Sequence, residues 1–270
     1  MSTCNGCATP EATSLSRAVL HETTEKLPHR ELVGSLQYLV NASRPDIAHV
    51  TRHVAKYLVC FDQTHYVQAK KVLRYLQATK NYGLVMDVSE GTPTELMTYS
   101  DADYANDPAD RRSIRGYVTM LDGNVISYAS RKQEINDMST CEAEYVAMSE
   151  AAKDILWLQG LCKDLAWQHP VPLLRGDNEG AIALSTKPGK HSKTKHIDNK
   201  YHMVRRNVEL DSMAVEHCGT EEMVTDIMTK PLGAVKFARF RKAMKVLPMV
   251  PAEKHHATSE TTIHDTTTVS

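Results

Sequence analysis

Apolar residues recur every three or four positions in the first third of the chain, between about residues 30 and 82. This spacing is typical of helices that bury one face. Pro45 interrupts the pattern, because proline and the residue before it disfavour the α-helical backbone conformation. The sequence therefore predicts one helix before Pro45, a second directly after it, and a third that ends near Gly83.

After Leu84 the apolar spacing changes to two, which is typical of β-strands. Three strands come first, then a long helix from about Ser139, then two further strands that alternate with helices. The predicted strands cover 96–100, 116–121, 125–129, 171–175 and 213–217. Hairpin strands followed by strand–helix alternation predict an α/β fold: a mixed five-stranded sheet flanked by helices and preceded by a small helical segment.

Composition and periodicity divide the chain into four parts. Residues 1–27 are polar and without periodicity, which predicts a disordered leader. The helical segment covers 28–90, the α/β domain covers 94–233, and 234–270 hold a C-terminal helix and a disordered tail rich in Thr and His. In the leader, Cys4 and Cys7 form a lone CxxC, which is a weak zinc signal because no second ligand pair lies nearby.

The overall composition excludes several classes of protein. The 270 residues are 41% hydrophobic, which fits a globular core, but no apolar run is long enough for a membrane span. The first 25 residues lack the basic and apolar regions of a secretory signal. Four of the six cysteines stand singly in apolar or periodic segments, which suits reduced thiols in an intracellular compartment.

The net charge is −1, so the distribution of charge matters more than its sum. From 187 to 206 seven Lys and Arg residues face one acid, Asp198, which leaves an excess of six positive charges. Such a run is either a solvated surface or, beside an acidic metal site, an anchor for phosphates. The residues expected to contact nucleic acid are Lys190, Lys193, Lys195, His196, Arg205 and Arg206 in this run, and Lys70, Lys71 and Arg74 on the third predicted helix.

Four acidic residues stand at strand ends and helix starts, where an α/β sheet gathers its ligands. Asp101 follows the first strand, Glu144 lies early in the long helix, and Asp177 follows the fourth strand. Asp226 lies early in a last helix, which is expected to begin after Thr220 and to end before Pro231. Each acid alone could be a surface residue or a helix cap. Together they would repel one another unless divalent cations neutralised them, and two Mg²⁺ ions could then hydrolyse a phosphodiester.

Seven stretches of the sequence resemble, in order, the ribonuclease H domain of copia-type LTR retrotransposon polyproteins. They are 99–105 (YSDADYA), 111–118 (RRSIRGYV), 127–133 (SYASRKQ), 139–147 (STCEAEYVA), 176–178 (GDN), 191–202 (HSKTKHIDNKYH) and 226–232 (DIMTKPL). The resemblance implies an RNase H-like fold and cleavage of the RNA strand of RNA–DNA hybrids. It also implies that Asp101, Glu144, Asp177 and Asp226 are the catalytic residues and ligands of two Mg²⁺ ions, for which Mn²⁺ can substitute.

The resemblance also bears on individual residues and on partners. Glu142 is a neighbour that could be confused with Glu144, but residues 144–147 match the register of ribonucleases H better. His217 resembles the mobile histidine of some ribonucleases H without a secure match. The spacing of His191, His196 and His202 does not suit zinc. The implied partners are the hybrid and the reverse transcriptase and integrase of the same polyprotein, in the cytoplasm, in virus-like particles or in the nucleus.

The helical segment resembles the thumb or connection region at the end of the reverse transcriptase in these polyproteins. The resemblance lies in 31–39 (ELVGSLQYL), 44–47 (RPDI) and 69–76 (AKKVLRYL). No polymerase palm and no YxDD-like motif is found, so no polymerase activity is expected of this fragment. It would be a truncated copy, a processed piece or a partial gene model.

Two alternatives to an active ribonuclease stay open. The first is a decayed retroelement fragment that binds nucleic acid without cutting it. The second is a strand-transfer nuclease of the integrase type. The presence of a fourth acid, Asp226, and of Thr229-Lys230-Pro231 argues against this alternative.

Overall fold

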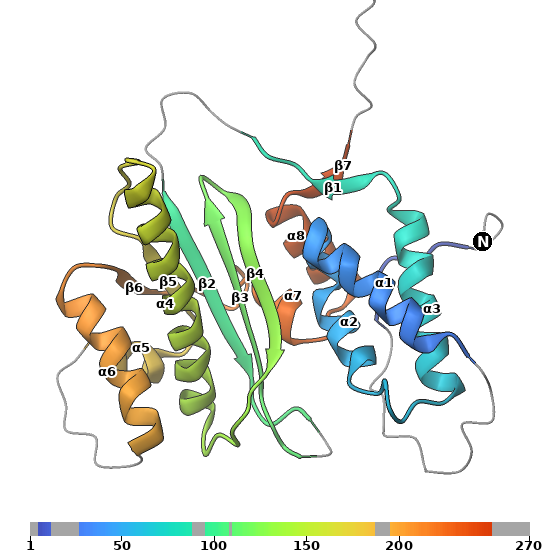
Figure 1. The fold of residues 1–270 in the computed structure, drawn as a ribbon, viewed down its shortest axis with the longest axis horizontal. Coiled ribbons are helices and arrows are strands. Elements are labelled where there is room, and N and C mark those ends of the chain that lie inside the picture. Colours follow the sequence, from blue (N-terminus) through green and yellow to red (C-terminus); the bar gives the residue numbers. More distant parts are fainter. Residues whose placement is uncertain (1–4, 12–26, 88–94, 108–109, 187–194, 250–270) are drawn as a thin grey trace, which may run out of the picture.

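The computed structural model describes residues 5–11, 27–87, 95–107, 110–186 and 195–249, and for 195–201 the backbone alone. A mixed sheet of five strands lies at its centre (Figure 1). Its strands are β2 (Leu96–Asp103), β3 (Ile114–Leu121), β4 (Asn124–Lys132), β5 (Leu173–Gly176) and β6 (Ala214–His217). The strand order is β4-β3-β2-β5-β6, antiparallel from β4 to β2 and parallel from β2 to β6. The predicted mixed five-stranded sheet is therefore confirmed.

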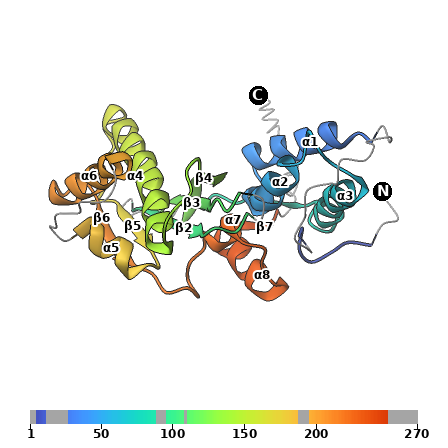
Figure 2. The same cartoon turned by 90° about the horizontal axis from the view of Figure 1, so that it is seen from below.

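Helices lie on both sides of this sheet, and Figure 2 shows the two groups separated by the strands. One group is α4 (Thr140–Asp164), α5 (Glu179–Thr186) and α6 (Lys195–Glu209). The other is α1 (His29–Ala42), the 3₁₀ turn η1 (Pro45–Ile47), α2 (Ala48–Ala55), α3 (Gln63–Ala78), α7 (Asp226–Thr229) and α8 (Ala234–Ala243). Successive side chains of β3 face opposite sides of the sheet. Val118 and Met120 pack in the core beneath α7 and α8, and Tyr117 packs in the core beneath α4.

The corner before η1 is held together by buried polar contacts. Arg44 forms a double hydrogen bond with Asp46, at 2.9 and 2.8 Å. The Tyr75 hydroxyl donates to the same carboxylate at 2.5 Å, and the Arg44 guanidinium also reaches Thr79 on the last turn of α3. The break predicted at Pro45 is thus a fixed junction between α1, α2 and α3.

The segment that follows α3 and the C-terminal end of the described chain meet in a small second sheet. Strand β1 (Tyr82–Leu84) pairs antiparallel with β7 (Val246–Pro248). Helix α8 packs with the helical segment, where Phe237 makes an edge contact with the Tyr75 ring at 5.5 Å. The C-terminal helix therefore shares its core with the helical segment, although the sequence suggested a separate unit from residue 234.

The leader was expected to be disordered, but residues 5–11 lie against α2 and α3. The Glu11 carboxylate contacts Nδ1 of His49 at 2.7 Å and Nδ1 of His53 at 2.6 Å. Gln68 on α3 donates to the Pro10 carbonyl at 3.0 Å. These contacts come from single polar side chains, which leave no periodic signal in the sequence. Cys4, the partner of Cys7 in the CxxC, lies outside the described residues.

The last helix also differs from the prediction. Thr220 does not begin a helix: the chain turns between residues 219 and 225, where the Glu222 N–H donates to the Gly219 carbonyl at 2.8 Å. Helix α7 begins at Asp226 and has only four residues, because Pro231 follows closely. Among the helices that the structure describes, none combines the length and the apolar composition that a bilayer crossing requires.

Candidate active site

Three of the four predicted acids converge at one end of the two central strands. Asp101 lies within β2, Asp177 directly follows β5, and Glu144 lies in the first turns of α4. Since β2 and β5 are parallel neighbours, their corresponding ends lie side by side. One carboxylate oxygen from each residue lies within 4.8 Å of the other two. The Ala102 N–H donates to Oε2 of Glu144 at 3.1 Å, which fixes α4 against β2.

This cluster gathers negative charge in two buried acids and in the half-buried Asp177. The Asp101 side chain is inaccessible to solvent, and Glu144 is also buried. Burial raises the pKa of the Asp101 carboxyl group, against the opposing effect of Lys230. Burial also raises the pKa of Glu144, and repulsion from Asp101 and Asp177 raises it further. Such a set of hard oxygen donors fits a divalent cation of the Mg²⁺ type, which would offset the repulsion.

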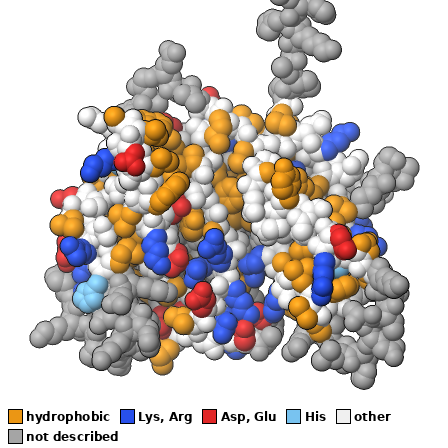
Figure 3. All heavy atoms as spheres, viewed as in Figure 1, with side chains coloured by type: hydrophobic (Ala, Val, Ile, Leu, Met, Phe, Trp, Pro, Cys, Tyr) orange, Lys and Arg blue, Asp and Glu red, His pale blue; other side chains and the backbone are white. Residues whose placement is uncertain are grey.

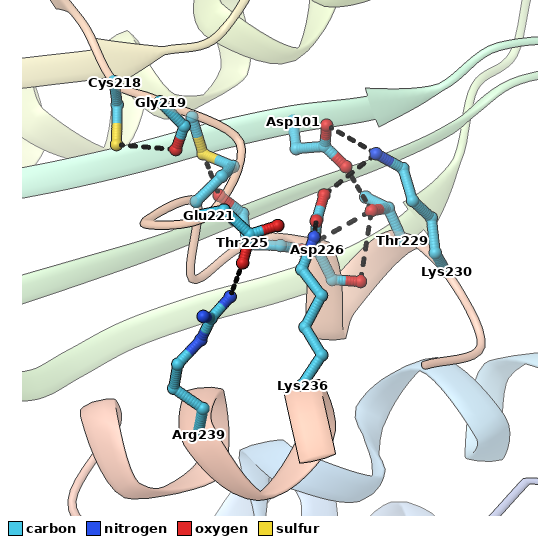
Figure 4. Close-up of polar contacts among 11 residues, drawn as sticks. Asp101, Cys218, Gly219, Glu221, Thr225, Asp226, Thr229, Lys230, Lys236 and Arg239 are labelled. Atoms are coloured by element: carbon cyan, nitrogen blue, oxygen red, sulfur yellow. Dashed lines mark hydrogen bonds and ion pairs between the residues drawn. The ribbon is translucent and has the colours of Figure 1, made fainter. Parts of the chain in front are cut away.

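Asp226 lies beside this cluster but is held by two lysines (Figure 4). Its Oδ1 atom lies 2.9 Å from Nζ of Lys230, and its Oδ2 atom lies 2.7 Å from Nζ of Lys236. The Lys230 ammonium also lies 3.2 Å from Oδ1 of Asp101. The structure therefore brings Asp101, Glu144 and Asp177 together directly, and connects Asp226 to them through Lys230.

The role of the residues around Asp226 was missed in the sequence. The Thr229 hydroxyl donates to Oδ2 of Asp101. Lys230 stands four residues after Asp226, a spacing that allows ion pairs on a helix. That spacing was the available signal, whereas Lys236 comes from α8 and could not be placed without the tertiary structure.

A glycine lets α7 approach the sheet closely enough for these contacts. Gly116 on β3 lies opposite Asp101 in the strand register. A Cβ atom at Gly116 would lie 2.6 Å from Cβ of Met228 and 3.0 Å from Cγ2 of Thr229. The absence of a side chain at this position therefore sets the distance between α7 and β3, and so brings α7 close to the neighbouring Asp101 on β2.

Glu142 and Glu144 have different roles in the first turn of α4. Oε2 of Glu142 accepts a hydrogen bond from the Met138 N–H at 2.8 Å, and Oγ of Ser139 accepts one from the Glu142 N–H at 3.2 Å. These contacts cap the helix. Glu144 instead faces the acidic cluster. The geometry therefore gives Glu142 a capping contact and places Glu144, the residue chosen from the family resemblance, with the other acids.

The residues predicted to contact nucleic acid are dispersed. Lys190 and Lys193 lie outside the described residues, and Lys195 and His196 lie on α6 in a part whose side chains are not described. Arg205 donates to the Leu184 carbonyl at 2.9 Å and so joins α6 to α5, whereas Arg206 is exposed. Lys70, Lys71 and Arg74 lie on α3, which Figure 1 places on the side of the helical segment away from the five-stranded sheet.

A groove that the sequence did not suggest lies between α4 and the edge of the sheet. It has a volume of about 230 Å³, and Arg115, Arg131, Lys153 and the exposed Trp157 contribute to its lining. Figure 3 shows Lys and Arg side chains across this part of the surface, interspersed with acids. One of these acids, Glu150, pairs with Lys153 at 2.7 Å. The groove is therefore of mixed charge.

Comparisons with known proteins place the chain among retroelement proteins. No protein-family model matches it. It is 36% identical over 258 residues to the retrovirus-related Pol polyprotein from transposon RE2 of Arabidopsis thaliana, which covers 93% of this chain and 17% of the polyprotein. It is 36% identical over 212 residues to the polyprotein from transposon TNT 1-94 of Nicotiana tabacum, covering 78% of this chain and 16% of that one.

Among solved structures, an RNase H1 isolated from compost shares 18% identity and a TM-score of 0.40, covering 50% of this chain and 92% of that one. The chain spans about a sixth of the length of the RE2 and TNT 1-94 polyproteins. The similarity to the RE2 polyprotein extends over 93% of the chain and includes both the helical segment and the sheet. The chain belongs to the family of retrovirus-related Pol polyproteins from copia-type transposons, of which it corresponds to one segment.

Proposed function

We propose that this chain hydrolyses the RNA strand of RNA–DNA hybrids with bound divalent cations, as the ribonuclease H segment of a retrotransposon polyprotein. The observation that carries the proposal is the convergence of buried Asp101 and Glu144 with half-buried Asp177, one carboxylate oxygen of each lying within 4.8 Å of the other two. Mutual repulsion among the three carboxylates, and the desolvation of Asp101 and Glu144, oppose folding. The three carboxylates suit the binding of a hard divalent cation beside a phosphodiester.

Each of the four acidic residues has a proposed role in binding divalent ions. Asp101 and Asp177 would hold an ion from adjacent strands, and Glu144 would hold it from α4, in a position fixed by the Ala102 N–H. A bound Mg²⁺ ion supplies an activated water molecule and stabilises charge on the phosphate oxygens. Asp226 is proposed as a ligand of a second ion with Asp101, and this arrangement would require Lys230 to release both carboxylates.

The proposed partners follow from the same site. Selectivity for a hybrid would come from contacts with 2′-hydroxyl groups and from groove shape rather than from base reading. Exposed cations such as Arg206 and Arg131 are available for phosphates. The reverse transcriptase and integrase of the same polyprotein are proposed as further partners, inside the cell.

A cleavage assay tests the proposal. The purified chain should cut the RNA strand of a labelled RNA–DNA hybrid in Mg²⁺ or Mn²⁺ and should stop when a chelator is added. Asp177→Asn should lose this activity while it keeps its circular dichroism spectrum. Glu179→Gln changes an exposed acid two residues away and should cut like the wild type. Hybrid binding without cleavage by the wild type would support a decayed copy and refute the nuclease proposal, as would full activity in Asp177→Asn.

A further inference from the structure

The contacts between α7 and β2 leave no oxygen of Asp101 or Asp226 without a donor. Lys230 and Lys236 each hold one oxygen of Asp226. Lys230 also holds Oδ1 of Asp101, and the Thr229 hydroxyl holds Oδ2. The Lys230 ammonium is thus a cation shared by the two carboxylates that a second metal ion would have to share.

We propose that Lys230 is a resident cation of this site: it occupies the position between Asp101 and Asp226, so that the free protein binds one divalent ion and accepts a second only when Lys230 is displaced. This inference rests on the proposed function, because it concerns ion binding by the same carboxylates. It assigns Lys230 as a positioning residue that controls when the second ion enters.

The backbone around Lys230 restricts the position of its ammonium group. Lys230 directly follows α7, and its N–H donates to the Asp226 carbonyl at 3.0 Å. Its backbone is extended and Pro231 follows, which limits the freedom of the preceding residue. Burial lowers the pKa of Lys230, but the charges of Asp101 and Asp226 raise it by more, so the amine stays protonated. Its side chain is 32% exposed, which leaves a route outward to solvent.

The two halves of the site differ in their occupants. Asp101 and Asp226 share Lys230, whereas Glu144 and Asp177 form no ion pair among the described residues. A first divalent ion at Asp101, Glu144 and Asp177 therefore does not have to replace an ammonium group bound to Glu144 or Asp177. A second ion at Asp101 and Asp226 has to replace one.

The net charge of the four carboxylates and two lysines also favours one divalent ion in the free protein. The four carboxylates carry four negative charges, and Lys230 and Lys236 carry two positive charges, so the ionised set has a net charge of −2. One divalent ion neutralises this set, and a second ion that replaces Lys230 would leave it at +1. A phosphodiester brings negative charge with it, so the second ion is expected to enter together with the nucleic acid while Lys230 turns towards solvent.

Ion binding to the metal-free full chain tests the proposal without relying on activity. Mn²⁺ uptake is measured by calorimetry and by the loss of the free-ion signal in electron paramagnetic resonance. We expect the wild type to bind about one ion and Lys230→Gln to bind about two. Lys230→Arg keeps the positive charge and should still bind one, and circular dichroism of each variant checks that it is folded.

Lys236→Gln is the matched control, because it removes the other ammonium from Asp226 and leaves the bridge to Asp101 in place. It should bind one ion if the position of Lys230 decides the stoichiometry. Two ions in the wild type, or equal stoichiometry in Lys230→Gln and Lys236→Gln, would overturn the inference and leave the proposed nuclease intact. No Mn²⁺ uptake by the wild type would overturn the proposed function as well.

Discussion

The close approach of α7 to the sheet can be tested by adding one methyl group, in the variant Gly116→Ala. The new Cβ atom would lie 2.6 Å from Cβ of Met228, 3.0 Å from Cγ2 of Thr229 and 3.4 Å from the Ala129 carbonyl oxygen. The two α7 atoms lie close to the helix backbone, so rotation of a flexible side chain cannot relieve the contact. Helix α7 itself must therefore move.

The size of the movement sets the expected effects. Carbon atoms pack best at roughly 3.5–4.0 Å, so α7 would have to retreat by about 1 Å. Overpacking of this kind costs about 1–3 kcal/mol in the free energy of unfolding, which leaves a domain of ordinary stability folded. The same movement would weaken the bond from Thr229 to Asp101 and shift Asp226. Because a misplacement of about 1 Å at an active site can cost about 100-fold in rate, cleavage should fall further than stability.

Urea unfolding and hybrid cleavage measure the two effects on the same preparation. Gly34→Ala is the control: the residue lies within α1, and an added Cβ would meet nothing within 4 Å. It should raise the free energy of unfolding by about 0.5–1 kcal/mol, because alanine favours the helix, and should leave cleavage unchanged. Wild-type stability together with wild-type cleavage in Gly116→Ala would refute the reasoning about α7.

Two further predictions concern the helical segment. The Asp62 side chain accepts hydrogen bonds from the backbone at the start of α3, so Asp62→Ala should lower the free energy of unfolding by about 1 kcal/mol, whereas Asp62→Asn, also a good cap, should cost less in the same urea titration. Burial raises the pKa of Glu11, but His49 and His53 lower it by more, to about 2. Its stabilising contribution is therefore present above pH 4.5 and is lost as the pH falls towards 2, so Glu11→Gln should destabilise the protein more at pH 5 than at pH 3; an equal loss at both pH values would contradict this.

The parts of the fold that could be predicted from the sequence are those with a local signal. The turn between β3 and β4 has a local signal in Asp122 and Gly123, a residue pair typical of hairpin turns, and both residues adopt the positive φ that such a turn requires. The start of α4 near Ser139 was predicted, and the spacing of Ser139 to Glu142 is the local signal of a cap, in which the hydroxyl accepts from the Glu142 N–H. Alternation and capping depend on neighbours along the chain, so a single sequence contains them.

The parts that could not be predicted depend on residues far apart in the sequence. Strands β1 and β7 have three residues each and are separated by most of the chain, so neither has a periodic pattern. The position of Lys236 against Asp226 depends on the angle between α7 and α8. The convergence of three acids was foreseen from strand ends and family likeness, but the occupation of the fourth acid by ammonium groups required the packing of α8.

The helical segment supports the candidate active site, although the two were expected to be separate units. Helix α7 carries Asp226 and contacts β2, β3 and α2, so it is held between the sheet and the helical segment. A single hydrophobic core runs from Val50 on α2 through Ile227 on α7 to Val118 on β3. Boundaries at residues 94 and 234 would cut this core and leave α7, which has only four residues, without one of its supports. Because so short a helix is not stable by itself, the position of Asp226 and Lys230 beside Asp101 depends on both the helical segment and the sheet.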